Sequence, residues 1–284
     1  MAATFPRTDV AGVSLPRMLI GSNWINGYSH TSPAADKQIT DYYCDTKRIG
    51  ELLDAYLEYG IDAIMASCFD GESLLWRAVK ETEQRTGKKF ILIDTPILDM
   101  SDSAEGRLNA QRRIELSAKN GVTFLLPHHS SAEELVNKHK GTMDRLPDYL
   151  SMIRDAGMIP GLSAHMPELI LFSDANEYDV QTYVQIYNCM GFLMQVEVEY
   201  IHKVIWESKK PVMSIKAMAA GRVSPFVGLS FSYATLRECD MVTLGAFLPK
   251  EVHEDVEISL AAIERRRPAL EGRSSPNKTA ALGG

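Results

Sequence analysis

Short apolar runs bounded by glycine alternate with amphipathic segments along this chain, and polar residues follow most of the runs. The clearest unit is Ala156–Ile170, AGMIPGLSAHMPELI. A glycine ends one predicted helix and a proline begins the next, so Met158–Leu162 is too short to be a helix. We therefore predict a buried strand at Met158–Leu162, whose end presents Ser163 and His165.

The same pattern predicts eight strands, most of them followed by a helix. The predicted strands are Arg17–Ser22, Ala63–Ala66, Phe90–Ile93, Val122–Leu126, Met158–Leu162, Thr182–Tyr187, Pro211–Ile215 and Met241–Leu244. The predicted helices are Thr46–Tyr59, Glu72–Thr86, Ala104–Lys119, a short one at Ala132–Lys138, Met143–Ala156, one from Pro167, Gln195–Ser208, Phe226–Glu238 and Lys250–Arg267. Eight units with right-handed crossovers favour a closed (β/α)8 TIM barrel. An open doubly wound sheet is the alternative, but its GxGxxG turn is absent from the chain.

Residues 1–267 are expected to form this barrel as one domain, since 45% hydrophobic residues supply a large core. The first residues, Met1–Leu15, predict an N-terminal hairpin or arm that plugs the lower end of the barrel. Residues 268–284 are small and polar, which predicts a flexible C-terminal tail.

Composition and charge exclude several classes of partner. The formal net charge is −7 and the longest basic cluster is Arg265–Arg267, so nucleic acid is not an expected partner. No apolar run approaches the roughly 18 residues that span a bilayer. The four cysteines are scattered and the first residues do not resemble a signal peptide, which predicts a cytoplasmic protein. The expected partner is a small molecule, and the sequence leaves the oligomeric state open.

The second half of the chain contains four motifs at the ends of predicted strands. In chain order they are AGMIPGLSAHMPEL, VQIYN, PVMSIKAMAAGR and DMVTLGAFLPKEVHEDV. Together they resemble the aldo/keto reductase family, and LPRMLIGS and YGIDAIMAS extend the resemblance into the first half. The resemblance implies a barrel with its site at the carboxyl ends of the strands. It also implies carbonyl reduction with NADPH, with an aspartate, a tyrosine, a lysine and a histidine as the catalytic groups.

The catalytic positions of that family are largely replaced here. Met65 aligns with the aspartate, Phe69 lies nearest the tyrosine, and Pro96 aligns with the lysine. His128 or His129 is the counterpart of the histidine. The closing loop GAFLPKEV also places apolar residues where the family binds the 2′-phosphate of the cofactor. NADPH is therefore disfavoured as a cofactor.

Polar residues at the predicted strand ends suggest a different chemistry. Asp94, His128 and His165 are the types of residue that bind a divalent metal, and they follow three neighbouring strands. Without a metal, His128 or His129 would act as a general base. Lys216 would then act electrostatically or as a Schiff-base amine. Solvated or hydrogen-bonded loop residues are the plainer interpretation of this set.

Ligand contacts are expected from other strand ends. The resemblance implies that Ser163, Gln185 and Asn188 contact a nicotinamide amide, although they could equally satisfy polar groups of the barrel. Gly221 and Arg222 lie beside a helix start, where N–H groups favour an anion such as phosphate, with a plain salt bridge of Arg222 as the alternative.

Aromatic residues are expected to form one wall of a substrate-binding pocket. Trp24 and Tyr28 lie on the long loop after the first strand, and Tyr187 ends the sixth strand. They form one side of a pocket or merely pack under their own loop.

Three functions fit these residues. The first is a diverged enzyme that uses acid–base or metal-assisted chemistry as a lyase, isomerase or hydrolase on a small polar or phosphorylated molecule. The second is an NADPH-dependent oxidoreductase that keeps His128 and in which another residue, such as Tyr28, donates the proton. The third is a non-catalytic sensor or binding protein built on a retired reductase barrel.

Overall fold

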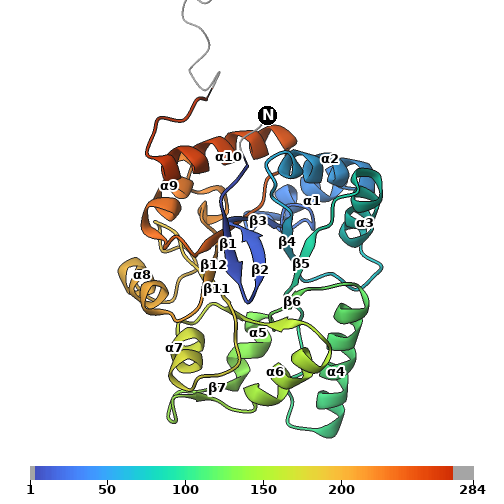
Figure 1. The fold of residues 1–284 in the computed structure, drawn as a ribbon, viewed down its shortest axis with the longest axis vertical. Helices are drawn as coiled ribbons and strands as arrows, with labels where there is room; N and C mark the ends of the chain where they lie inside the picture. The colour runs from blue at the N-terminus through green and yellow to red at the C-terminus, as the bar shows by residue number, and fades with distance from the viewer. Residues whose placement is uncertain (1–3, 271–284) are drawn as a thin grey trace, which may run out of the picture.

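Parallel strands form the centre of the molecule, and helices surround them (Figure 1). The structure is a computed structural model that describes residues 4–270, so most of the tail predicted at 268–284 lies outside the described residues. The central sheet has the order β10-β11-β12-β13-β3-β4-β5-β6-β9, and every pairing in it is parallel. Its strands are β3 (Met18–Gly21), β4 (Ala63–Ala66), β5 (Ile91–Asp94), β6 (Phe124–Leu125), β9 (Ile159–Pro160), β10 (Leu162–Ala164), β11 (Tyr183–Ile186), β12 (Val212–Ile215) and β13 (Met241–Leu244).

The barrel closes through one glycine between β9 and β10. Gly161 donates its N–H to the carbonyl of Leu125 in β6, while Leu162 donates to Thr182 just before β11. Strands β9 and β10 are therefore two parts of the fifth strand of the barrel. The first part, β9, pairs with β6, and the second part, β10, pairs with β11. Counting them together gives the eight strands of a (β/α)8 barrel, which confirms the predicted fold class.

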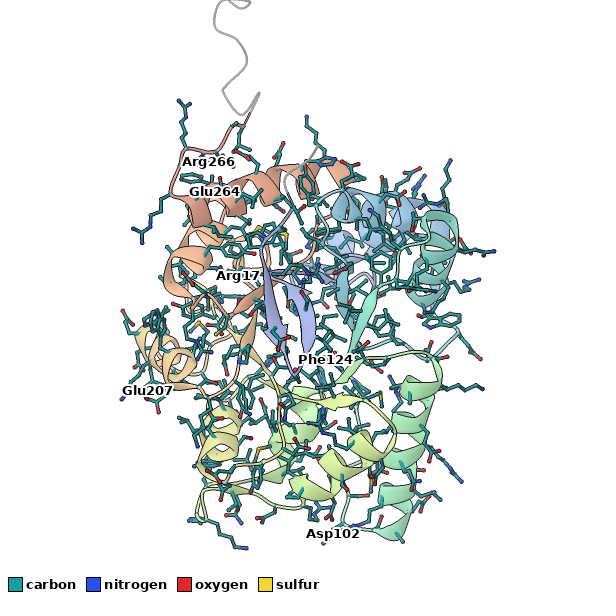
Figure 2. The ribbon with its side chains drawn as sticks, viewed as in Figure 1. Arg17, Asp102, Phe124, Glu207, Glu264 and Arg266 are labelled. Carbon is teal, nitrogen blue, oxygen red and sulfur yellow. The ribbon has the colours of Figure 1, made fainter. Side chains whose placement is uncertain are left out.

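An antiparallel hairpin precedes the barrel, as predicted. It consists of β1 (Arg7–Val10) and β2 (Val13–Pro16) and lies across the ring of strands in Figure 1. Its residues Val10 and Leu15 belong to the same buried cluster as Phe124, which is labelled in Figure 2. The hairpin thus fills one end of the barrel and leaves the opposite end for a site.

Helices cover the outside of the strands, because each has one apolar face that packs against the sheet. Several begin at side-chain caps, such as Ser73 before α3 and Ser103 before α4. The helices are α1 (Pro33–Tyr42), α2 (Thr46–Leu57), α3 (Leu74–Thr86), α4 (Ala104–Lys119), α5 (His129–Ala132), α6 (Leu146–Asp155), α7 (Glu168–Ala175), α8 (Val198–Glu207), α9 (Pro225–Thr235) and α10 (Pro249–Glu264).

Two segments differ from the sequence prediction. The long loop after β3 contains α1, whose start is fixed by the Ser32 side chain, which accepts from Ala35 N–H. The helix predicted at Ala132–Lys138 is wrong. Helix α5 starts earlier, at His129, and a 3-10 turn follows it to Leu135, after which the chain forms the small hairpin of β7 (Val136–Asn137) and β8 (Thr142–Met143). The early helix start places His129 beside the barrel mouth.

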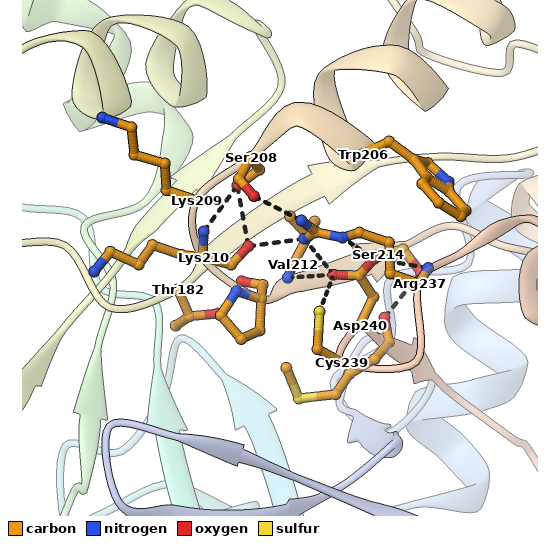
Figure 3. Close-up of polar contacts among 12 residues, drawn as sticks. Thr182, Trp206, Ser208, Lys209, Lys210, Val212, Ser214, Arg237, Cys239 and Asp240 are labelled. Carbon is orange, nitrogen blue, oxygen red and sulfur yellow. Dashed lines mark hydrogen bonds and ion pairs between the residues drawn. The ribbon is translucent and has the colours of Figure 1, made fainter.

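A buried ion pair fixes the amino-terminal ends of β12 and β13 (Figure 3). Asp240 is fully buried and accepts hydrogen bonds from the Val212 N–H at 2.9 Å and from the Arg237 guanidinium at 2.7 and 2.9 Å. The same guanidinium donates to the carbonyls of Ser208 and Lys210. This network lies at the end of the barrel away from the cavity described below, so its role is structural. Within residues 4–270, no helix combines the length and the apolar character that a membrane crossing requires.

Candidate functional site

A cavity of about 430 Å³ lies at the carboxyl ends of the strands. Strand ends from β3, β4, β11, β12 and β13 contribute to its wall, together with the loop between β3 and α1. This is the position at which barrel enzymes place their chemistry. The predicted site residues that line the cavity are Trp24, Tyr28, His128, His129, Ser163, His165, Lys216 and Gly221.

Three histidines gather on one side of the cavity. The ring centroids of His128 and His129 are 4.2 Å apart, and the rings of His129 and His165 stack at 3.6 Å with an angle of 15° between their planes. His128 and His129 follow β6, whereas His165 follows β10. Because β6 and the β9–β10 strand are neighbours in the barrel, the fold brings these imidazoles together.

Two of these imidazoles are held in the neutral form. Burial lowers the pKa of His128 to about 4, and the neighbouring His129 adds to the shift. The pKa of His165 is also lowered to about 4, first by burial and then by His129 and Lys216. At neutral pH both rings are therefore uncharged, and an unprotonated imidazole nitrogen is the form that binds a metal ion or accepts a hydrogen bond.

Glu133 is a site residue that the sequence analysis missed. One of its carboxylate oxygens accepts the backbone N–H groups of His165 and Met166 at 2.9 and 3.1 Å. The other lies 3.7 Å from Nδ1 of His129. Its spacing of four residues after His129, on one face of a helical turn, was the signal that could have revealed it.

Lys216 lies on another part of the wall, directly after β12. Its Nζ atom is 3.0 Å from Nε2 of His30, which comes from the loop after β3. Burial lowers the pKa of the Lys216 amine. Further hydroxyl groups that line the cavity come from Thr95 and Thr243, and the Thr243 hydroxyl is buried without a hydrogen-bond partner. Neither threonine was predicted as a site residue. Thr243 lies two residues after Met241, so both side chains point to the same face of β13, and this spacing was the signal that could have revealed Thr243.

Asp94 faces away from the cavity, which corrects its expected placement. Ile93 points into the barrel interior, so the next side chain points outward to the helix layer. There the fully buried carboxylate accepts from Arg113 at 2.9 Å and from Ser117 at 2.7 Å, both in α4. Burial raises the pKa of Asp94, and Arg113 opposes that shift. Asp94 therefore does not lie with His128 in one site.

Gln185 and Asn188 are buried outside the cavity wall, contrary to their expected placement. Val184 lines the cavity, so the adjacent Gln185 points the other way, and its amide lies 3.4 Å from the carbonyl oxygen of His165. The Asn188 side chain closes the turn after β11 by accepting from the Phe192 N–H at 2.9 Å. Backbone groups satisfy the whole Asn188 amide and the Nε2 atom of Gln185, whereas the Oε1 atom of Gln185 is buried without a hydrogen-bond partner.

Tyr187 and Arg222 also lie off the cavity wall. The hydroxyl of Tyr187 is 3.0 Å from that of Thr235 in α9, so the ring packs in the helix layer. The guanidinium of Arg222 lies 4.2 Å above the Phe192 ring and reaches the carbonyl of His30 at 3.4 Å. Arg222 therefore supports the loop that carries His30.

The positions of the family's proton donors are apolar in three dimensions as well. Met65 lines the cavity, and Phe69 is fully buried. The described residues that form the wall include no carboxylate, and their single phenol is Tyr28. The side-chain groups of the wall that can take part in a reaction are therefore imidazole, amine and hydroxyl groups.

Comparison with known proteins places this fold among the aldo-keto reductases. A protein of Pseudomonas aeruginosa assigned to the aldo-keto reductases is 14% identical, with a TM-score of 0.65 over 91% of this chain and 95% of that one. An aldo-keto reductase of Bacillus halodurans in its holo form is 11% identical, with a TM-score of 0.63 over 95% and 99%. The silkworm Bombyx mori aldo-keto reductase in complex with NADP is 12% identical, with a TM-score of 0.60 over 95% of both chains.

These likenesses confirm the predicted resemblance at the level of the fold. No family model matches the sequence, and no curated protein matches it either. Identities of 11–14% show a shared architecture and leave the activity to be argued from the site.

The residues at the family's cofactor positions do not fit NADPH bound in the usual way. The Glu251 carboxylate accepts the N–H groups of Phe247 and Leu248 at 2.7 and 3.3 Å, so it occupies the start of α10, where an anion would otherwise bind. The Phe247 ring also packs against those of Trp24 and Tyr42, with centroids 5.7 and 4.9 Å away. A negative charge and apolar rings therefore lie at the position where the resemblance implies a phosphate site.

Proposed function

We propose that this chain is an enzyme that binds a small polar or phosphorylated molecule and converts it by acid–base or metal-assisted chemistry, as a lyase, isomerase or hydrolase. One observation carries the proposal. His128, His165 and Lys216 come from three different strand ends, and all three line one cavity of about 430 Å³. A cavity of this size suits a small molecule, and these residue types are those that transfer protons or stabilise charge.

His128 is suited to donate a hydrogen bond to a substrate oxygen. Its Nδ1 atom accepts the backbone N–H of Ser130, so the neutral ring carries its proton on Nε2. A neutral imidazole that donates to a carbonyl oxygen polarises the carbonyl without giving up its proton. The role of His128 is therefore to activate the substrate.

Lys216 and His165 complete the proposed set. The Lys216 amine, when protonated, would stabilise negative charge that develops on the substrate, or a phosphate group. The ring nitrogens of His165 have no hydrogen-bond partner among the described residues, so this imidazole is free to accept a proton. The same imidazole returns the proton to another atom of the substrate, and the reaction needs no oxidant or reductant.

The test is proton exchange in the absence of any nicotinamide. The full chain is incubated in D2O with small carbonyl and phosphorylated compounds, and deuterium incorporation or conversion is followed by NMR. We expect catalysis with at least one compound, reduced about 100-fold or more in His128→Ala and in Lys216→Met. His139→Ala is the matched control, because His139 is exposed in the turn between β7 and β8. Failure with all compounds, or equal rates in the three variants, would reject the proposal.

A second candidate is an NADPH-dependent oxidoreductase in which Tyr28 replaces the family's tyrosine. The observation in its favour is that Tyr28 lines the cavity and the fold is shared with a silkworm reductase solved with NADP. This candidate requires the cofactor to bind despite Glu251 and Phe247. Saturable NADPH binding, followed by quenching of Trp24 fluorescence, would support it.

A further inference from the structure

His129, Glu133 and His165 form a compact group on one side of the cavity. One potential ligand atom from each residue lies within 4.8 Å of those of the other two. His129 begins α5, Glu133 lies one helical turn later, and His165 follows β10. Two imidazole nitrogens and one carboxylate oxygen therefore converge from two separate segments.

Hydrogen bonding does not account for this group. The Nδ1 atom of His129 is buried and has no hydrogen-bond partner. It lies 3.7 Å from the Glu133 carboxylate, which is too long for a hydrogen bond. The adjacent His165 ring is stacked on it and supplies no partner within its plane. A buried polar atom without a hydrogen-bond partner is costly, and the Glu133 carboxylate, at ion-pair distance from Nδ1, offsets that cost only in part.

We propose that His129, Glu133 and His165 bind one divalent transition-metal ion with a preference for nitrogen and oxygen ligands, of the Zn²⁺ type. Two histidines and one carboxylate are a ligand set typical of catalytic zinc and of non-haem iron. The inference rests on the proposed function and specifies its metal-assisted form, in which His165 is a ligand of the ion and not the proton acceptor. It also replaces Asp94 and His128, which the sequence suggested as ligands beside His165.

Binding one ion requires the His129 and His165 rings to tilt out of their stack, because the in-plane lone pairs of nearly parallel rings do not meet at one point. A tetrahedral ion about 2.1 Å from each ligand atom places those atoms roughly 3.4 Å apart. The observed spacing is at most 4.8 Å, so the ligand atoms would have to move closer as the two rings rotate toward the carboxylate. Glu133 is already held in place, because one of its oxygens accepts two backbone N–H groups while the other faces His129. Such outer contacts orient ligands in metal sites.

The open side of the site faces the cavity. His129 and His165 belong to the cavity wall, whereas Glu133 lies behind them. Three protein ligands with the remaining positions open are the pattern of a catalytic metal, which can bind a substrate oxygen. The ion would lie beside His128 and share the cavity with Lys216.

The test is metal binding, measured without reference to activity. The full chain is treated with a chelator, dialysed, and titrated with Co²⁺ by visible absorption and with Zn²⁺ by calorimetry. We expect one ion per chain, with affinity at least tenfold weaker in His129→Ala and in His165→Ala. His139→Ala is the control for loss of an exposed histidine, and Mg²⁺, which prefers oxygen ligands, should not compete.

Two further variants keep the assignment falsifiable. Glu133→Gln retains the shape of the side chain and should weaken binding, while circular dichroism checks that it folds. His128→Ala should bind the ion as the wild type does. No stoichiometric binding, or binding lost in His128→Ala and kept in His129→Ala, would overturn the site.

One experiment distinguishes failure of the metal site from failure of the proposed function. Proton exchange is measured with and without added Zn²⁺. Exchange without stoichiometric metal binding would overturn the metal site and leave acid–base chemistry standing. Stoichiometric binding without exchange or conversion would support the metal site and count against the proposed function.

Discussion

The Nζ atom of Lys216 lies 3.0 Å from Nε2 of His30, although 186 residues separate them in the chain. On the other side of the imidazole, Nδ1 of His30 lies 3.2 Å from the carbonyl oxygen of Tyr28. A carbonyl can only accept, so Nδ1 carries the proton and Nε2 accepts from the Lys216 amine. Both residues have left-handed backbones, with φ of 63° for Lys216 and 57° for His30. Tertiary contacts hold this pair in conformations that few residues adopt.

We expect the Lys216 amine to react faster than exposed lysines with a limiting amount of acetic anhydride near pH 8. Burial lowers the pKa of this amine, so a larger fraction is uncharged and nucleophilic at a given pH. Peptide mass spectrometry would compare it with Lys37, whose side chain is 74% exposed. Several-fold earlier acetylation of Lys216 is the expected result. Modification slower than that of Lys37 would show that the amine is protonated or inaccessible.

NADPH is not expected to bind with micromolar affinity. Trp24 lines the cavity, so a nicotinamide placed there would quench its fluorescence. We expect no saturable change, because Glu251 occupies the start of α10 and Phe247 packs against Trp24. If quenching does saturate, a carbonyl reductase assay with Tyr28→Phe follows. Loss of reduction in that variant would favour the oxidoreductase over the acid–base enzyme.

The fold could be predicted because its signals are local. Glycines that end helices and short apolar runs located the strands, and the predicted bounds of Ala63–Ala66 and Met241–Leu244 agree with β4 and β13. Helix α4 was likewise predicted at both ends, Ala104–Lys119. The sequence contains the serine cap and the proline that begin α1, but the whole segment between the first two strands was interpreted as one long loop.

The site was less predictable because it depends on side-chain direction. In β5, Leu92 packs toward the helices and Ile93 into the barrel, so both faces are apolar and no alternation shows where Asp94 points. The contact between His129 and His165 depends on which strands are neighbours. A one-residue shift reverses a side chain, which local patterns cannot resolve.

Glu83 provides a test of pH-dependent stability. Its buried carboxylate accepts the Phe90 N–H at 2.9 Å and pairs with Lys80 at 3.1 Å. Although burial opposes ionisation, these contacts together lower its pKa below the usual 4.5. A lowered folded-state pKa gives stability that is present above about pH 4.5 and is lost as the pH falls through the folded value.

We therefore expect Glu83→Gln to lower the free energy of unfolding by about 1–2 kcal/mol at pH 7. The difference from the wild type should shrink as the pH is lowered from 5 to 3. Urea denaturation at several pH values measures it, while Glu81→Gln, another glutamate of α3 with an exposed side chain, serves as the control. A difference that stays constant with pH would contradict the argument.

The pair of Arg237 and Asp240 is expected to be essential for stability. Removing Asp240 leaves a largely buried guanidinium and the Val212 N–H without their acceptor. We expect Asp240→Ala to cost about 3–5 kcal/mol in the free energy of unfolding. In contrast, Asp41→Ala removes an exposed pair with Lys37 and should cost at most about 1 kcal/mol. Equal effects in urea denaturation would mean that the network in Figure 3 contributes little.

Gly161 joins the two halves of the fifth strand, and we expect no other residue to fit there. A Cβ atom would lie 2.6 Å from Cγ of Leu126 and 2.8 Å from the carbonyl oxygen of Thr182, closer than packed atoms approach. Because the carbonyl belongs to the backbone that enters β11, it cannot move without disturbing the barrel closure. Gly161→Ala should therefore cost about 1–3 kcal/mol or more.

The matched substitution is Gly50→Ala in α2. There the nearest atom to a new Cβ is the Thr82 hydroxyl oxygen at 3.4 Å, an ordinary contact. Alanine is the better helix former, so this variant should be as stable as the wild type or gain about 0.5–1 kcal/mol. Urea denaturation of the two variants decides whether the Cβ contacts control the outcome. If Gly161→Ala is as stable as Gly50→Ala, the fifth strand tolerates a side chain and the barrel closes by a looser arrangement than β9 and β10 describe.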